Sequence, residues 1–343
     1  MDVEGLVTAR IVVIGASLSG IDALSRLVHA LPSDFPAPIL ICQHVASHSP
    51  GLLPQILGGA GPLKAVHPKS PQLLDPGVIY VAPPDRHMLV EKGYVRLSHG
   101  PHENLMRPAV DPLFRSAALA YGPAVVGVVL TGQLDDGTAG LMAIKDRGGV
   151  AIVQEPAEAT AQSMPRSALR HVKVDYQCRL SEMADLLTAL ARDAPGEPPT
   201  TDAEALLETE DRIARGDFSV EDWWRIERMS EPSGLNCPTC RSALYEVADK
   251  RLLRFRCRSG HGFSALSLLS GQADARENLL SSVFGALIEE ATLAKRLLGM
   301  PEYAAEPHIA GGLAGRVSEL ETESGRVCEW LHMLTGLVEP EPI

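Results

Sequence analysis

Residues 11–17 read IVVIGAS, an apolar run that ends in a glycine, an alanine and a serine. Two further runs have the same design: residues 39–44 read ILICQH, and residues 125–136 read VVGVVLTGQLDD. Continuous valine, isoleucine and leucine runs are typical of strands buried on both faces, as in parallel sheets covered by helices. Ligands of such sheets bind outside the carboxyl ends of the strands. We therefore expect the polar residues that end these three runs to meet at one edge of a sheet.

Strands and helices alternate from about residue 8 to residue 193, which predicts one doubly wound, mostly parallel α/β domain. Residues 88–97 differ, because two short apolar runs around a Glu-Lys-Gly turn predict an antiparallel hairpin on that sheet. Helical patterns lie near residues 20–30, 112–121, 137–147 and 182–192. Residues 194–230 are expected to form a linker that begins with prolines and glycine and continues as an acidic helix at residues 201–213.

The last third of the chain predicts two further units. Residues 231–270 form a compact cysteine-bearing segment, and residues 271–338 form a helical tail with helices near 276–300 and 313–334, separated by prolines and a Gly-Gly pair. The second helix has a coiled-coil seam with one polar position, made of Leu313, Val317, Leu320, Ser324, Val327, Leu331 and Leu334. Because the seam is short, we favour an intramolecular hairpin over a seam that recruits a partner.

Composition restricts the class of protein. The chain has 343 residues, 45% of them hydrophobic, and a formal charge of −12. No apolar run is long enough to insert into a membrane, and the acidic start of the chain does not resemble a secretory signal, so the cytoplasm is the expected location. The negative charge argues against non-specific binding of nucleic acid.

Ser17, His44 and Asp136 supply the three residue types of a nucleophilic catalytic triad. Ser19 and Asp22 predict a capping box at the start of the next helix, so the serine would lie on a sharp strand-to-helix turn. Free N–H groups at such a turn can stabilise an oxyanion. Taken singly, the serine could cap a helix, the histidine could be a satisfied strand-end residue, and the aspartate could cap the following helix beside a solvated neighbour. The combination favours acyl-transfer chemistry.

A dinucleotide-binding turn is the alternative for the first strand. Gly15, Ser17 and Gly20 have the spacing of that fingerprint, with the middle glycine replaced. The next strand ends in Gln43-His44, however, and supplies no acid for a ribose. The sequence therefore favours the hydrolytic interpretation.

Five blocks of sequence border the expected site: Gly15-Ala16-Ser17, Gln43-His44, residues 107–116 (RPAVDPLFRS), Leu130-Thr131-Gly132 with Asp136-Gly137, and Met164-Pro165-Arg166. In order and spacing they resemble the catalytic domain of CheB-type chemotaxis protein-glutamate methylesterases, over residues 8–193. The resemblance implies that Ser17 is the nucleophile, His44 the general base and Asp136 the residue that orients the base. It implies hydrolysis of glutamate methyl esters on the cytoplasmic helices of methylated chemoreceptors, with methanol released and no catalytic cofactor. Some members also deamidate receptor glutamines.

Several positions beside the expected site depart from the family pattern: Leu18, Ser19, Gln133, Leu134 and Ser163. Their effect on rate and substrate choice stays open, although the Gln133 amide could donate to an oxyanion. The receiver domain that usually precedes this catalytic domain is expected to be absent, because about ten residues precede the first strand. A non-catalytic scaffold and a serine esterase for another carboxylic ester remain alternatives.

Cys237, Cys240, Cys257 and His261 form a C-x2-C and a C-x3-H pair separated by 16 residues. This spacing, with soft thiolate and imidazole ligands, predicts a structural, zinc-ribbon-like site with no open coordination position. The scattered Cys42, Cys178 and Cys328 are expected to be buried thiols, as in a reducing compartment.

Residues 253–258 alternate apolar side chains with Arg254, Arg256 and Arg258. One face of such a strand would pack on the small core, and the other would present a basic stripe. We expect the stripe, with the tail helices, to dock a protein partner such as an acidic receptor bundle, in preference to nucleic acid or a merely solvated edge.

Overall fold

The structure of the protein is a computed structural model that describes residues 10–197, 204–217, 219–247, 249 and 251–336. Two compact units divide the chain, Met1–Leu268 and Leu269–Ile343. The first unit contains a large α/β domain and the cysteine-bearing segment. The second unit consists of long helices.

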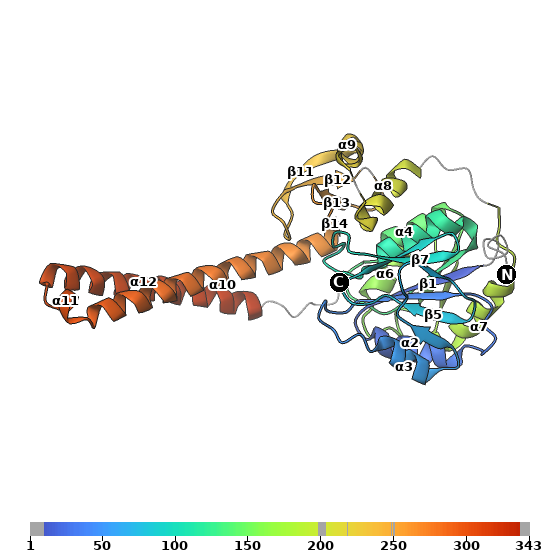
Figure 1. Ribbon diagram of the computed structural model, residues 1–343, viewed down its shortest axis with the longest axis horizontal. Helices are drawn as coiled ribbons and strands as arrows, with labels where there is room; N and C mark the ends of the chain where they lie inside the picture. Colours follow the sequence, from blue (N-terminus) through green and yellow to red (C-terminus); the bar gives the residue numbers. More distant parts are fainter. Residues whose placement is uncertain (1–9, 198–203, 218, 248, 250, 337–343) are drawn as a thin grey trace. The chain divides into compact units, whose positions relative to one another are not determined.

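A seven-stranded sheet forms the centre of the first unit (Figure 1). Its strands pair in parallel in the order β10-β9-β8-β1-β2-β5-β3. Their bounds are β1 (Ile11–Ala16), β2 (Ile39–Gln43), β3 (Lys64–Val66), β5 (Val78–Val81), β8 (Val125–Val129), β9 (Val150–Gln154) and β10 (Tyr176–Cys178). Every residue of β1, β2 and β8 is buried. The predicted parallel sheet is therefore confirmed, and its three most apolar strands are neighbours.

Helices cover both faces of this sheet. One core contains apolar residues of α2 (Gly20–Ala30), α3 (Leu53–Ala60) and α7 (Leu180–Arg192). The other core contains those of α4 (Val110–Tyr121), α5 (Thr138–Asp146) and α6 (Ser163–His171). A short 3-10 turn, η1 (Gly122–Ala124), leads from α4 into β8. Helices α3 and α6 were not predicted from the sequence, because each is short and Gly58 and Gly59 lower the helix propensity of α3.

The predicted antiparallel hairpin is confirmed as β6 (His87–Glu91) and β7 (Tyr94–Ser98). The short strand β4 (Gln72–Leu73) pairs with β7, and the three form a separate small sheet.

The predicted linker contains two helices, α8 (Glu204–Arg215) and α9 (Val220–Arg228). The first corresponds to the predicted acidic helix, although its expected start and the end of the proline-rich stretch, residues 198–203, lie outside the described residues. The Ser98 hydroxyl on β7 donates to the carbonyl of Ala214 over 2.7 Å. This end of α8 is therefore tied to the α/β domain.

Two serine–aspartate pairs show that a capping sequence does not ensure a cap. Ser219 and Asp222 form a capping box at the start of α9, which was not predicted. Ser19 is the N-cap residue of α2, but its φ of 60° is left-handed and its side chain makes no capping hydrogen bond. The capping box predicted for Ser19 and Asp22 is therefore wrong, because the turn after Ser17 sets a different backbone conformation.

The cysteine-bearing segment, called the ribbon below, is a four-stranded antiparallel sheet. Its strands are β11 (Ser230–Asn236), β12 (Ala243–Val247), β13 (Arg254–Cys257) and β14 (Gly262–Ser264). Helix α10 (Ala265–Leu298) begins directly after β14, so the helix starts earlier than the predicted residue 276.

The second unit contains most of α10, the short α11 (Pro301–Ala304) and α12 (Pro307–Gly336). Leu320 at the centre of the seam is completely buried, and Val317, Ser324 and Val327 are at most 9% exposed. Lys295 on α10 pairs with Glu321 on α12 over 2.6 Å. The seam thus closes an intramolecular hairpin, as favoured from the sequence.

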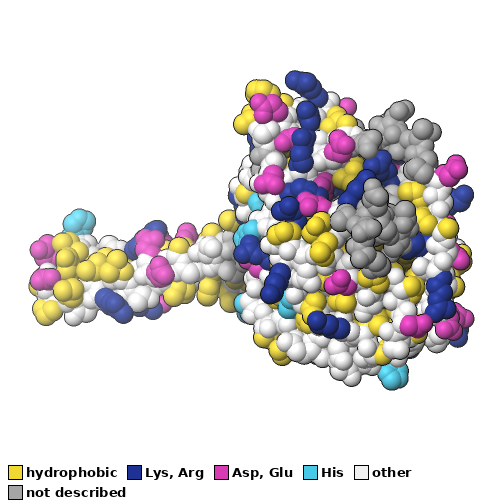
Figure 2. Space-filling model, turned by 45° about the vertical axis from the view of Figure 1, so that its right-hand side comes forward, with side chains coloured by type: hydrophobic (Ala, Val, Ile, Leu, Met, Phe, Trp, Pro, Cys, Tyr) yellow, Lys and Arg dark blue, Asp and Glu magenta, His cyan; other side chains and the backbone are white. Residues whose placement is uncertain are grey.

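Gly311 and Gly312 lie inside α12, so the predicted break there is wrong. A glycine costs a helix only about 1 kcal/mol, which packing along the seam can offset. Hydrophobic side chains are nevertheless exposed along these helices (Figure 2), among them Leu279, Val283, Trp330 and Met333. Within the described residues, no helix combines the length and apolar character needed to cross a membrane. Residues 337–338 of the predicted tail lie outside the described residues.

Candidate active site

Three neighbouring strands bring Ser17, His44 and Asp136 together. Ser17 directly follows β1, His44 follows β2, and Asp136 ends the loop after β8. The Ser17 Oγ lies 3.0 Å from His44 Nδ1, and His44 Nε2 lies 2.7 Å from Asp136 Oδ2. The side chains of His44 and Asp136 are 10% and 3% exposed. The predicted spatial meeting of the three side chains therefore occurs in the structure.

The backbone around the serine is fixed by hydrogen bonds between the strand ends. The N–H of Ser17 donates to the Thr131 carbonyl over 3.0 Å, and that of His44 donates to the Ala16 carbonyl over 3.1 Å. Gln43 Nε2 donates to the carbonyls of Ser17 and His44 over 2.7 and 3.0 Å. Gln43 thus connects the backbones of Ser17 and His44. The sequence analysis missed this contact, although the place of Gln43 before the histidine at a strand end was a usable signal.

Asp136 is a buried carboxylate that is surrounded by N–H donors. Its Oδ2 accepts from the Val110 N–H over 2.7 Å, in addition to His44. Its Oδ1 accepts from Asn104 Nδ2 over 2.8 Å and from the N–H groups of Gly137 and Asp111 over 2.9 and 3.1 Å. Burial alone would raise the pKa of Asp136, but the hydrogen bond and charge of His44 and these donors outweigh it and lower the pKa. Asp136 is therefore ionised and fixed in orientation.

A second carboxyl group, Asp111, lies beside Asp136. Burial raises its pKa well above the usual value, and the charge of Asp136 adds to this effect. Asn104 Nδ2 donates to Asp111 Oδ2 over 2.9 Å as well as to Asp136, so one amide group separates the two carboxyl groups. No sequence motif indicated Asn104.

Asp135 was expected to be a solvated neighbour of Asp136, and this expectation is wrong. The residue is 4% exposed, and its Oδ1 accepts a hydrogen bond from the Ser264 hydroxyl at the end of the ribbon. Burial raises the pKa of Asp135 to about 6. The loop after β8 therefore contacts the ribbon as well as the triad.

Two backbone N–H groups beside Ser17 are available to an oxyanion. Among the described residues, the N–H groups of Leu18 and Ser19 have no hydrogen-bond acceptor, whereas the Ser17 N–H donates to the Thr131 carbonyl. Gly132, in the loop after β8, lies against Ser17, since a Cβ on Gly132 would be 2.8 Å from Ser17 Cβ. The Gln133 side chain is exposed.

The space that a dinucleotide would need at the first turn is filled. A Cβ on Gly20 would lie 2.0 Å from Gln43 Oε1, and β2 ends in Gln43 without an acid. The turn after β1 therefore leaves no room for the pyrophosphate of a dinucleotide, which contradicts the alternative interpretation of this turn.

The four predicted metal ligands also come together. The ligand atoms of Cys237, Cys240, Cys257 and His261 all lie within 4.8 Å of one another. Cys240 and Cys257 Sγ are 3.6 Å apart, and Cys257 Sγ is 3.4 Å from His261 Nδ1. Tetrahedral Zn–S bonds of about 2.3 Å place sulfur ligands about 3.8 Å apart, so the donor set fits zinc. The other three cysteines are free thiols. The prediction that they are buried is confirmed for Cys42 and wrong for Cys178 and Cys328, which are partly exposed.

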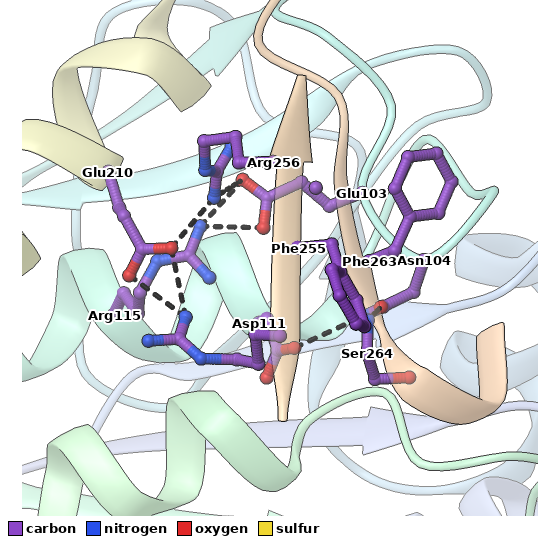
Figure 3. A pocket seen from close by; sticks show the side chains of 11 residues that line it. Glu103, Asn104, Asp111, Arg115, Glu210, Phe255, Arg256, Phe263 and Ser264 are labelled. Atoms are coloured by element: carbon purple, nitrogen blue, oxygen red, sulfur yellow. Dashed lines mark hydrogen bonds and ion pairs between the residues drawn. The ribbon is translucent and has the colours of Figure 1, made fainter. Parts of the chain in front are cut away.

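The basic stripe predicted on the ribbon is wrong for two of its three arginines. Arg256 is 2% exposed and pairs with Glu103 and Glu210 over 3.3 and 2.9 Å, and Arg254 pairs with Glu210 over 2.9 Å. Figure 3 shows Arg256, Glu103 and Glu210 pointing toward one another in a small polar cleft. These arginines therefore join the ribbon to the α/β domain and α8, and Arg258 alone of the three is exposed.

Comparison with known proteins identifies the α/β domain. The family model described as CheB methylesterase matches residues 12–187. A Leptospira interrogans protein, provisionally named protein-glutamate methylesterase/protein-glutamine glutaminase, is 39% identical over 180 residues, which are 52% of this chain and 93% of the relative. The protein-glutamate methylesterase FrzG of Myxococcus xanthus is 38% identical over 160 residues, 46% of this chain and 48% of FrzG.

A solved structure agrees with these relatives. The crystal structure of the Thermotoga maritima CheB methylesterase catalytic domain matches with a TM-score of 0.51 and 31% sequence identity. The match covers 53% of this chain and 98% of the Thermotoga chain. The chain therefore belongs to the CheB methylesterase family and is a methylesterase, a hydrolase.

Proposed function

We propose that Ser17, His44 and Asp136 are the nucleophile, the general base and the orienting acid for hydrolysis of glutamate methyl esters on chemoreceptors. The observation that supports this most directly is the continuous hydrogen-bonded chain from Ser17 Oγ through both imidazole nitrogens to Asp136 Oδ2. Because the ionised Asp136 accepts from Nε2–H, His44 presents a lone pair at Nδ1 to the serine hydroxyl. This tautomer is the one that can accept the Ser17 proton.

The reaction proceeds in two halves. His44 Nδ1 takes the Ser17 proton as Oγ attacks the ester carbonyl, and the N–H groups of Leu18 and Ser19 stabilise the oxyanion. The tetrahedral intermediate collapses when His44 returns the proton to the departing methanol. Water then attacks the acyl-enzyme as it gives a proton to the same nitrogen, and His44 returns this proton to Ser17 Oγ as the glutamate carboxylate leaves. A glutaminyl amide follows the same course with ammonia as the leaving group.

The partners of this reaction are the methylated cytoplasmic helices of chemoreceptors, and the cytoplasm is the corresponding location. Membership in the CheB methylesterase family and similarity to relatives named protein-glutamate methylesterases support this substrate class.

The test is methanol release from a methylated receptor by the full chain. Ser17→Ala should abolish release, and a fluorophosphonate should label the parent chain at Ser17 but not this variant. Ser25→Ala is the matched control, because this serine is partly exposed on α2 and, among the described residues, its hydroxyl donates only to the Ile21 carbonyl. Release by Ser17→Ala at the parental rate would overturn the assignment. Turnover of small esters alone would point to another carboxylic ester, and labelling without any turnover would point to a scaffold.

We also propose that Cys237, Cys240, Cys257 and His261 hold a structural Zn²⁺. When bound, the ion would cross-link the ends of the ribbon strands, and four protein ligands would leave no position for substrate. The pKa of Cys237 is lowered to about 7 by hydrogen bonding to Cys257 and to backbone N–H groups, which favours the thiolate that zinc requires.

Metal analysis of the purified chain should find one zinc per chain. Cys240→Ser should lower that content and the resistance of the ribbon to proteolysis, while Cys328→Ser should change neither. Full resistance of a zinc-free chain would contradict the proposal.

A further inference from the structure

Asn104 uses its whole side chain in hydrogen bonds. Its Nδ2 donates to Asp136 and Asp111, and its Oδ1 accepts from the Ser264 N–H over 2.8 Å and from the Ser267 hydroxyl over 2.9 Å. The residue is 7% exposed, and Figure 3 shows its side chain pointing toward Asp111. Its backbone φ of 50° is left-handed, a conformation that asparagine tolerates better than most residues. The side chain therefore has a single fixed orientation.

Both partners of Asn104 Oδ1 come from the ribbon and the first turn of α10. Ser264 is the last residue of β14, and Ser267 lies in α10 and is completely buried. The Ser264 hydroxyl also donates to Asp135, and the Asn104 N–H donates to the Gly262 carbonyl over 2.8 Å. The contact between the ribbon and the α/β domain is therefore centred on the residue that holds Asp136.

Two of the proposed metal ligands flank the turn that directly precedes β14. Cys257 and His261 bracket the turn that leads into Gly262, and the Cys257 N–H donates to the His261 carbonyl over 3.0 Å. Arg256, next to Cys257, anchors the same turn through the Gly260 carbonyl over 2.8 Å and reaches Glu103, the neighbour of Asn104. A displacement of this turn would move both Ser264 and Ser267.

We propose that Asn104 is a positioning residue for Asp136 and that the end of the ribbon, through Ser264 and Ser267, holds Asn104 in place. The ribbon then helps to orient the catalytic aspartate through two successive hydrogen bonds, from Ser264 to Asn104 and from Asn104 to Asp136. This inference rests on the proposed function of Asp136. It accounts for the burial of polar groups between two segments that lie about 160 residues apart in the sequence.

The physical effect of Asn104 is on the orientation and charge of Asp136. Without the amide, two buried carboxyl groups face each other, and Asp111 Oδ2 loses the one donor recorded for it among the described residues. Asp136 could then rotate or share a proton with Asp111, and His44 would lose the fixed acceptor of its Nε2–H. Small displacements of a catalytic group can lower turnover by about 100-fold.

The experiment compares Asn104→Gly, Ser267→Ala and the matched control Ser282→Ala in the full chain. Glycine accepts the left-handed backbone of residue 104. Ser282 is an exposed α10 serine whose hydroxyl, within the part of the chain that the structure describes, donates only to the Asn278 carbonyl. Two readouts are taken: kcat and KM for the methyl ester, and the low-field proton resonance of His44 Nε2–H in chain labelled with ¹⁵N-histidine, assigned by its loss in Asp136→Asn.

We expect Asn104→Gly to lower kcat about 100-fold with little change in KM and to abolish the low-field resonance. Ser267→Ala should lower kcat about fivefold or more and shift the resonance, and Ser282→Ala should change neither. Parental kcat and an unchanged resonance in folded Asn104→Gly would overturn the positioning role. If that variant does not fold, an unchanged kcat and resonance in Ser267→Ala would overturn the role of the ribbon.

The resonance is measured without substrate, so the inference can fail separately from the proposed function. A parent chain that releases no methanol would overturn the function, whereas the response of the resonance to Asn104→Gly would still report on the hydrogen bond to Asp136.

Discussion

Asp136 and Glu103 are both buried carboxylates of the first unit, but the protein compensates their charges in different ways. Asp136 accepts from three backbone N–H groups and one amide, and its ionic partner is His44. Glu103 instead pairs with two guanidinium groups, those of Arg115 at 2.6 Å and Arg256 at 3.3 Å. Burial raises the pKa of Glu103, and the two arginines outweigh it and lower the pKa.

The difference follows from what each carboxylate does. In the mechanism that we propose, His44 gains and loses a proton in each half-reaction. The groups that donate to Asp136 besides His44 are neutral, so the protonated imidazole would be the cation that interacts with this carboxylate. The arginines around Glu103 keep their charge at all ordinary pH values, so that cluster is static and joins two segments. Neutral N–H donors thus stabilise a carboxylate whose partner would change its protonation state, whereas arginines stabilise a contact between two segments of the chain.

The largest effect should come from Asp136→Asn. An asparagine cannot hold the tautomer of His44 that accepts the serine proton, so we expect turnover to fall by about 10⁴-fold. Methanol release from methylated receptor measures it. Asp34→Asn, at a pair with Arg192 on the surface, is the control. Turnover within tenfold of the parent would show that the carboxylate charge is not needed.

Arg256→Met should act on stability. Removing one arginine leaves Glu103 and Glu210 buried with fewer cations, which typically costs about 3–5 kcal/mol. We expect a lower urea midpoint for the first unit, whereas Arg258→Met, at an exposed residue that directly follows β13, should leave it unchanged. Equal urea midpoints for the two variants would mean that the buried ion pairs of Arg256 contribute no more to stability than the exposed pair of Arg258.

Asp135 is an intermediate case, because its buried side chain accepts from one hydroxyl and is in contact with no cation of the described residues. Burial raises its pKa to about 6, and the charge of Asp136 adds to this effect. The hydrogen bond from the Ser264 hydroxyl and the charge of His171 oppose it. The folded chain binds this proton more tightly than the unfolded chain, so stability contributed by this group falls as pH rises from about 4 to 6.

Above pH 6 the buried, ionised Asp135 lowers the free energy of unfolding by about 3 kcal/mol at most. Asp135→Asn should therefore raise the stability at pH 7 by about 1–3 kcal/mol and flatten the pH dependence between about 4 and 6. Thermal unfolding at several pH values measures both effects. An identical pH profile in parent and variant would mean that Asp135 titrates normally.

The sequence predicted the elements that depend on local pattern. The apolar runs before Ser17 and His44 identified two buried parallel strands, and the spacing of Cys237 to His261 identified the ligand cluster. The capping box at Ser19 and the helix break at Gly311 were wrong, because neighbouring structure outweighs preferences worth only about 1 kcal/mol.

The exposed or buried state of the ribbon arginines could not be derived from their alternation. An alternation with a period of two residues predicts which side chains share a face of a strand, but it does not predict what covers that face. Arg254 and Arg256 are covered because Glu103 and Glu210, distant in sequence, pack against them. Asn104 was missed for the same reason, since Asp136, Ser264 and Ser267, three of its four side-chain partners, are distant in the sequence.

The sequence by itself determined the parallel sheet, the edge at which Ser17, His44 and Asp136 emerge, and the grouping of the four cysteine and histidine ligands. These follow from side-chain periodicity, from the shared direction of parallel strands and from short ligand spacing, which are local properties. The tertiary structure alone decided that the ribbon packs on the α/β domain and that Asn104 connects it to Asp136. That contact depends on hydrogen bonds and buried ion pairs between distant segments, whose geometry no local pattern contains.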